Sequence, residues 1–335
     1  MPLILTRPEV LVLYAEAAER RWVLPSFGTE NLTTTEAILA GALAHAEKIG
    51  IPDLPITVAI THRYPERSQT SAYSHTGDPV LGLRLFFADL RALAAPGSPF
   101  ARLRILAHLD HGQHDLDLDA LDSPQGNFSS VMFDASALSF DDNIRATRAY
   151  VERHGSTLVI EGACDSIAHV GEAGATPCTP PDDAERYHRA TGVDWIVANL
   201  GTEHRAGVSQ LAYRDDIARE ISRRIGPRLC LHGASSVAPD HLGRLFADGV
   251  GKVNLWTALE RDSSADLLTE LVARPASVAG PATARRLQDQ GLLGPRADVT
   301  APVSLDYCTT RYRQQVVYQS MKRAVTAHLA RWYPV

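Results

Sequence analysis

Short, continuous apolar runs alternate with helix-like segments along nearly the whole chain. The runs are rich in valine, isoleucine and leucine and lack polar alternation, which is typical of parallel strands buried on both faces. Eight such runs separated by helical segments predict an α/β fold of the (β/α)8 TIM-barrel type. The runs begin at Trp22, Ile56, Leu103, Phe128, Thr157, Asp194, Arg228 and Gly251.

The chain length and the segments outside this pattern indicate the domain organisation. A chain of 335 residues is compatible with a single α/β barrel, so we expect one domain over residues 1–335. A polar insertion at 62–78 follows the second predicted strand, on the side where barrels build their sites. A C-terminal helical extension at 274–335 contains proline and glycine and ends in an amphipathic helix.

Composition and charge exclude several classes of function. The net charge is -6 and the basic residues are scattered, so we expect no nucleic-acid partner. No apolar stretch is long enough to span a bilayer, and the N-terminus lacks the features of a signal peptide. The four cysteines show no zinc-ribbon or CxxC spacing, which fits reduced thiols. These features predict a cytoplasmic protein with no membrane partner and a small-molecule substrate.

Three histidines follow predicted strands: His111 in LAHLDHG, His204 in ANLGTEHR and His232 in CLHGASS. The ends of parallel barrel strands meet at one mouth, so we expect these imidazoles to converge. Three neutral imidazoles leave a tetrahedral zinc ion one open position, as in catalytic sites. Asp110 stands beside the first histidine, where a carboxylate can transfer protons. The spacing alone leaves open the alternative that each histidine is only hydrogen-bonded.

Five motifs, in order along the chain, resemble those of class II fructose-bisphosphate aldolases. They are HLDHG, NFSSVMFDAS, TGVDWIVANLGTEH, LCLHGASS and GVGKVNLWT, and PSFGTEN near Pro25 resembles the segment after the family's first strand. The similarity runs from about Thr6 to Leu259. The resemblance implies a cytoplasmic class II aldolase, a lyase that acts reversibly on a ketose phosphate or related sugar through a zinc-stabilised enediolate.

The resemblance also implies roles for individual residues. Asp110 would exchange a proton with the hydroxyl formed from the aldehyde partner, and Glu172 would remove the α-proton of the donor. Asp134 would lie near a secondary metal position. The implied ligands of the catalytic Zn²⁺ are His111, His204 and His232.

Substrate contacts and assembly are implied in the same way. Asn254 would hydrogen-bond the enediolate. A substrate phosphate would lie at Gly233, Ser235 and Thr257, with a monovalent cation near it. The resemblance and the apolar, arginine-rich C-terminal helix suggest a homodimer or homotetramer.

Departures from the family pattern cluster at the phosphate end. Ala234 and Ser236 replace glycines, and a Cβ at either position limits the approach of an anion to the backbone. Trp256 takes the place of a short polar side chain, and Ala163 replaces a glutamate after the fifth strand. We therefore expect a substrate altered from fructose 1,6-bisphosphate. Arg205 is a candidate to rebuild anion binding, since guanidinium suits phosphate or carboxylate.

The sequence is also compatible with two other functions. The same metal site would also serve isomerisation, epimerisation or dehydration of a sugar derivative. A barrel that has lost its substrate would act as a non-catalytic binding protein, although buried polar groups are costly without a purpose.

The insertion and the scarce lysines leave further alternatives. The insertion carries His62, Arg63, Arg67 and Tyr73, and it either covers a different aldehyde or is a solvated surface loop. The chain has three lysines, and the metal chemistry needs none of them as a Schiff base. Lys252 is therefore expected to be an ordinary barrel lysine.

Overall fold

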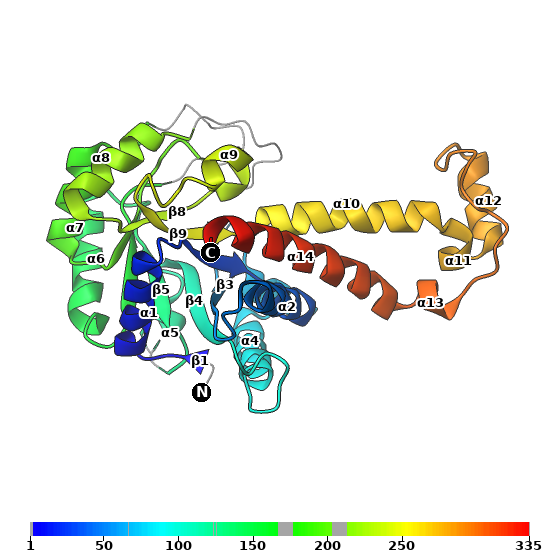
Figure 1. Ribbon diagram of the computed structural model, residues 1–335, viewed down its shortest axis with the longest axis horizontal. Coiled ribbons are helices and arrows are strands. Elements are labelled where there is room, and N and C mark those ends of the chain that lie inside the picture. The colour runs from blue at the N-terminus through cyan, green and yellow to red at the C-terminus, as the bar shows by residue number, and fades with distance from the viewer. Residues whose placement is uncertain are drawn as a thin grey trace.

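The structure is a computed structural model that describes residues 3–65, 67–122, 124, 126–166, 177–202 and 213–334. Within these residues, eight parallel strands form a closed ring in the order β4-β3-β2-β9-β8-β7-β6-β5, and β5 pairs with β4 to complete it. The predicted (β/α)8 barrel is confirmed (Figure 1). The strands are β2 (Leu24–Gly28), β3 (Pro55–Thr61), β4 (Arg104–Gln113), β5 (Ser130–Asp134), β6 (Val159–Ala163), β7 (Trp195–Val197), β8 (Leu229–Leu231) and β9 (Val250–Leu255).

Helices cover the outside of the barrel, and their ends follow the expected capping chemistry. Asn31 accepts a hydrogen bond from the Thr34 N–H at the start of α2, and Gly50 ends that helix with φ 72°, a left-handed conformation that glycine adopts readily. The principal outer helices are α1 (Arg7–Glu19), α2 (Leu32–Ile49), α4 (Pro79–Leu93), α6 (Phe140–His154), α7 (Pro181–Thr191) and α8 (Asp215–Ile225). Shorter elements are β1 (Leu3–Ile4), α3 (Gln69–Ala72), α5 (Leu118–Leu121), η1 (Ala234–Ser236) and α9 (Pro239–Leu242).

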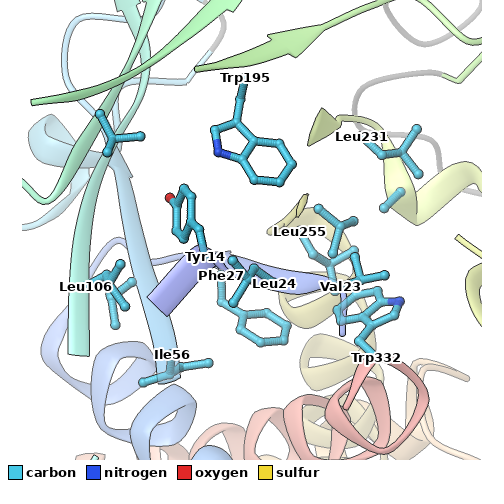
Figure 2. Close-up of a cluster of buried hydrophobic side chains, with 14 of the residues drawn as sticks. Tyr14, Val23, Leu24, Phe27, Ile56, Leu106, Trp195, Leu231, Leu255 and Trp332 are labelled. Carbon is cyan, nitrogen blue, oxygen red and sulfur yellow. The ribbon is translucent and has the colours of Figure 1, made fainter. Parts of the chain in front are cut away.

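Two aromatic contacts tie helices to the barrel core. Tyr14 of α1 meets Trp195 of β7 edge to face, with ring centroids 5.4 Å apart. Phe27 of β2 lies 6.1 Å from the ring of Trp332 near the C-terminus. Figure 2 shows these four side chains among other buried apolar groups. Both ends of the chain are therefore packed against the barrel.

The last part of the chain forms a helical arm that projects from the barrel (Figure 1). Its two long helices, α10 and α14, contact each other along the arm, and α14 also packs on α2. A Cβ at Gly41 of α2 would lie 2.6 Å from a methyl carbon of Val325, so glycine permits this close packing. The arm consists of α10 (Thr257–Ala273), α11 (Pro275–Ala279), α12 (Pro281–Asp289), α13 (Leu305–Cys308) and α14 (Thr310–Trp332). The projection thus begins directly after β9, earlier than position 274. Among the described helices, we find none with the length and apolar character that a membrane crossing requires.

Candidate active site

A bulge in β4 brings two neighbouring side chains to one cavity. The register between β4 and β5 shifts between Leu109 and Gly112, and His111 has φ 49°, which is uncommon for a residue other than glycine. Successive side chains of a regular strand point to opposite faces, but the bulge redirects them. Asp110 and His111 consequently line the same cavity.

His111 faces His232, which follows β8. The Nε2 atom of His111 lies 3.2 Å from the Nδ1 atom of His232, and the rings meet edge to face with centroids 4.9 Å apart. Two nitrogens bound at about 2.0–2.1 Å to one tetrahedral zinc ion are separated by about 3.3 Å, so this spacing fits a shared ion. Ligand atoms of Asp110, His111 and His232 all lie within 4.8 Å of one another. Two of the three predicted histidines are therefore brought together.

The second nitrogen of His111 is fixed by a carboxylate. Its Nδ1 atom lies 2.8 Å from Asp134 Oδ2, and Asp134 Oδ1 also accepts hydrogen bonds from the backbone N–H and hydroxyl of Ser136. Burial alone would raise the pKa of Asp134, but the bonds from His111 and Ser136 bring it below its usual value. An ionised carboxylate in this place sets the orientation of a metal-ligating imidazole.

Asn254 of β9 connects the histidine pair to Asp110. Its Nδ2 atom donates to Asp110 Oδ1 at 2.9 Å and lies 3.1 Å from His232 Nε2. Its Oδ1 atom accepts a hydrogen bond of 2.7 Å from Lys252 Nζ. The amide thus has a donor directed into the site, close to where the substrate oxygens are expected.

Lys252 of β9 forms an ion pair inside the barrel. It is fully buried, and its Nζ atom lies 2.5 Å from Glu161 Oε1, which is also fully buried. Burial alone would lower the pKa of Lys252, but the neighbouring Cys230 and Glu161 raise it above its usual value. The contact between Lys252 and Asn254 could have been predicted from the sequence, because residues two positions apart on one strand point to the same face.

The cavity beside these groups is open to solvent and extends between the ends of β8 and β9 and the ends of β2 and β3. Gly233, Ser235, Asn254 and Thr257, all predicted to contact substrate, line it. Gly233 has φ 67°, which favours glycine at this turn. The predicted phosphate end therefore shares one cavity with the histidine pair.

Three predicted site residues, Glu172, His204 and Arg205, lie outside the described residues. Within the insertion, Arg67 lines the cavity, whereas Tyr73 donates to Asp89. Tyr64, which the sequence did not single out, stacks on His111 with ring centroids 4.5 Å apart. The insertion is therefore partly a wall of the cavity and not only a solvated surface loop.

Comparisons with known proteins point to one family. The family model described as fructose-bisphosphate aldolase class-II matches residues 9–332. A fructose-bisphosphate aldolase from Treponema pallidum (strain Nichols) is 29% identical over 259 residues, which cover 69% of each chain. A 6-phospho-5-dehydro-2-deoxy-D-gluconate aldolase from Bacillus licheniformis is 28% identical over 251 residues, which cover 73% of this chain and 77% of the relative. The crystal structure of fructose-bisphosphate aldolase from Campylobacter jejuni shares the fold, with a TM-score of 0.74 at 16% identity, and the match covers 98% of this chain and 95% of that chain.

Proposed function

Because this chain belongs to the class II fructose-bisphosphate aldolase family and is an aldolase-type lyase, we propose that it uses a zinc ion to cleave and form a carbon–carbon bond in a ketose phosphate or related sugar. The altered phosphate end favours a substrate other than fructose 1,6-bisphosphate. The observation that carries the proposal is the facing pair His111 and His232, 3.2 Å apart, with Asp110 beside them.

The residues present fit a divalent ion. The pair of imidazole nitrogens is buried, and a carboxylate fixes the ring of His111 from behind. His204 would be the third ligand. When bound, the ion supplies positive charge that polarises the oxygens of the donor and stabilises the charge that develops there. In this arrangement Asp134 would orient His111 and would lie near a secondary metal position.

The remaining steps belong to side chains around this pair. Asp110 Oδ2 would take and return the proton of the hydroxyl formed from the aldehyde, because the other oxygen of that carboxylate is engaged by Asn254. Asn254 Nδ2 would donate to a donor oxygen. Glu172 would take the α-proton of the donor. The phosphate would be held by Gly233, Ser235, Thr257 and Arg205, with a monovalent cation nearby.

Metal analysis and isotope exchange test this function. Protein purified without chelator should contain about one zinc ion per chain, as expected for a site of this type, and should exchange the α-protons of dihydroxyacetone phosphate with D2O. The His232→Ala variant should lose both properties. Carbon–carbon cleavage of a ketose distinguishes an aldolase from an isomerase, an epimerase or a dehydratase, and a pure protein that binds no divalent ion would remove the basis of the proposal.

We expect the active form to be a homodimer or homotetramer assembled through the arm. The arm leaves large apolar side chains exposed, which is typical of a surface that a partner covers. These side chains are Leu268, Val272, Leu292, Val303 and Leu305, with exposed fractions between 43% and 80%. Light scattering after gel filtration should give a mass two or four times 36.4 kDa. The Leu292→Asp/Leu305→Asp variant should shift toward the mass of the monomer. The cysteines are free thiols, which supports a location in the reducing cytoplasm.

A further inference from the structure

Four side chains at the end of β3 and directly after it form one wall of the cavity, here called the β3 wall: Thr61, Tyr64, Arg67 and Gln69. Their backbone is held by a set of local hydrogen bonds. The Thr61 hydroxyl donates to the Arg67 carbonyl at 2.5 Å, and the Thr61 N–H donates to Gln69 Oε1 at 2.8 Å. The Thr70 hydroxyl donates to the His62 carbonyl at 3.0 Å. These bonds tie the end of β3 to the residues that follow it.

A second set of contacts attaches the same segment to the loop after β4. The Arg63 N–H donates to Oδ1 of the buried Asp117 at 2.9 Å, and the Arg63 guanidinium pairs with Asp119. His62 Nε2 lies 3.4 Å from Asp119 Oδ2. Hydrogen bonds therefore hold the backbone at Arg63 and at Arg67, on either side of Tyr64.

Arg67 is held between a carboxylate and an aromatic ring. Its Nε and Nη2 atoms donate to Glu30 Oε2 at 3.0 and 2.6 Å, and its guanidinium lies over the ring of Trp256, 5.5 Å from the centroid. The indole fits here because Gly28 has no side chain; a Cβ there would lie 2.8 Å from Trp256 Cβ. Of the described residues that line the cavity, Arg67 is the only lysine or arginine.

The charge at this end of the cavity disfavours a phosphate. Glu30 already neutralises Arg67, and Glu260 of α10 adds a second carboxylate nearby. Burial and the neighbouring Glu30 raise the pKa of Glu260 to about 7, so this group is partly ionised at neutral pH. A phosphate dianion would have to compete with Glu30 for one guanidinium and would be repelled by both carboxylates.

Hydroxyl groups suit the same surroundings. An ion pair offers N–H donors and carboxylate acceptors side by side, and a hydroxyl uses both. The Gln69 amide adds polar capacity on the wall, and the Trp256 ring provides an apolar face for C–H groups. A neutral, polyhydroxylated chain can therefore bind here without displacing the Arg67–Glu30 pair.

The order of strands around the barrel indicates which part of the substrate lies against the β3 wall. The phosphate-binding candidates Ser235 and Thr257 follow β8 and β9, whereas the β3 wall follows a strand that pairs directly with β4, the strand that carries Asp110. We infer that the β3 wall, with Glu30 and Trp256, binds the unphosphorylated polyol chain of the aldehyde partner. This inference rests on the proposed function, because it assumes that the donor lies toward Ser235.

Paired aldehydes test the inference directly. Zinc-loaded protein is given dihydroxyacetone phosphate and either glyceraldehyde or erythrose, both enantiomers, each with and without a terminal phosphate. We expect kcat/KM to be at least about tenfold higher for the unphosphorylated member of each pair, as one displaced charge-assisted contact implies. A preference for the phosphorylated aldehydes would overturn the inference.

Variants locate the preference. Glu30→Gln should shift the ratio about tenfold toward the phosphorylated aldehydes, because Arg67 then has no carboxylate partner. Arg67→Met should lower kcat/KM for the unphosphorylated aldehydes. Because the Arg67 side chain is exposed, this variant tests the inference even if Glu30→Gln does not fold. Glu152→Gln, which removes one member of an exposed Arg–Glu pair on α6, is the matched control and should leave the ratio unchanged. An unchanged ratio in both Glu30→Gln and Arg67→Met would also overturn the inference.

Deuterium exchange into dihydroxyacetone phosphate, measured without aldehyde, separates this inference from the proposed function. Exchange together with a preference for phosphorylated aldehydes contradicts the role of the β3 wall and leaves the aldolase proposal intact. Absence of both exchange and cleavage contradicts the proposed function, and the inference is lost with it.

Discussion

Lys252 Nζ donates to Asn254 Oδ1 across 2.7 Å, inside the barrel and below the histidine pair. An ammonium group can only donate, so this bond directs the oxygen of the amide toward Lys252 and its Nδ2 toward Asp110 and His232. Glu161 balances the buried charge of Lys252 at 2.5 Å. The ion pair therefore acts on the site through the orientation of one amide.

The first prediction concerns this ion pair. Lys252→Met should lower the free energy of unfolding by about 3–5 kcal/mol, because it leaves the Glu161 charge buried and unpaired. The Lys252→Met/Glu161→Gln double variant should recover most of the stability measured by urea unfolding. Its kcat should nevertheless stay roughly 100-fold below that of the natural protein, since Asn254 is no longer held in register. A double variant that regained both stability and kcat would show that the pair only supports the fold.

The second prediction concerns the carboxylate behind His111. Asp134→Asn should weaken zinc binding roughly 10–100-fold, because a neutral amide holds and polarises the imidazole less well than a carboxylate. Competition with a chromophoric chelator measures this affinity without any turnover. Asp141→Asn, at an exposed aspartate on α6, is the control and should bind zinc normally. Equal affinities of the two variants would contradict the role given to Asp134.

The third prediction separates the two proton transfers. Asp110→Asn should retain zinc and should still exchange the α-protons of the donor, because a different group is proposed to remove them. Condensation with an aldehyde should fall roughly 100- to 10,000-fold, the usual contribution of a general acid or base. Zinc content, D2O exchange and condensation are measured on the same preparation. Loss of exchange in parallel with condensation would place Asp110 at the α-carbon instead.

The sequence predicted the barrel because strand burial is recorded in local apolar runs, and those runs needed no knowledge of distant contacts. His111 and His232 were predicted to meet because strand ends of a barrel share one mouth. The bulge that turns Asp110 and His111 to the same cavity was not predictable, since it depends on pairing with β5. The ion pair of Lys252 with Glu161 likewise joins residues 91 positions apart in the chain, so no local sequence pattern predicts it.

The wall after β3 shows the same limit. The sequence marked Arg67 as part of a polar insertion, but its partner Glu30 lies 37 positions earlier and its aromatic neighbour Trp256 lies near the end of the barrel. A polar loop that faces solvent and a polar loop that lines a cavity contain the same types of residue, so composition cannot distinguish them. Only the folded chain, in which β2, β3 and β9 are neighbours, distinguishes the two.

The last prediction uses the carboxyl group of Glu260, whose pKa is raised from 4.5 to about 7 by burial and by Glu30. A raised pKa means that the folded protein binds this proton more tightly than the unfolded chain does, so stability falls as pH rises through the interval from about 4.5 to about 7. Glu260→Gln removes this penalty. The variant should therefore gain stability relative to the natural protein between pH 5 and pH 8, by on the order of 1–2 kcal/mol after allowance for solvent screening of a half-buried group.

Urea unfolding at several pH values measures this difference. Glu152→Gln, at an exposed position on α6, should show a difference from the natural protein that does not change with pH. The charge of Glu30 raises the pKa of Glu260, so Glu30→Gln should lower that pKa and reduce the pH-dependent gain in the Glu30→Gln/Glu260→Gln double variant. A difference between Glu260→Gln and the natural protein that stays constant from pH 5 to pH 8 would mean that Glu260 is ionised throughout, and that the second carboxylate near the β3 wall carries its full charge at neutral pH.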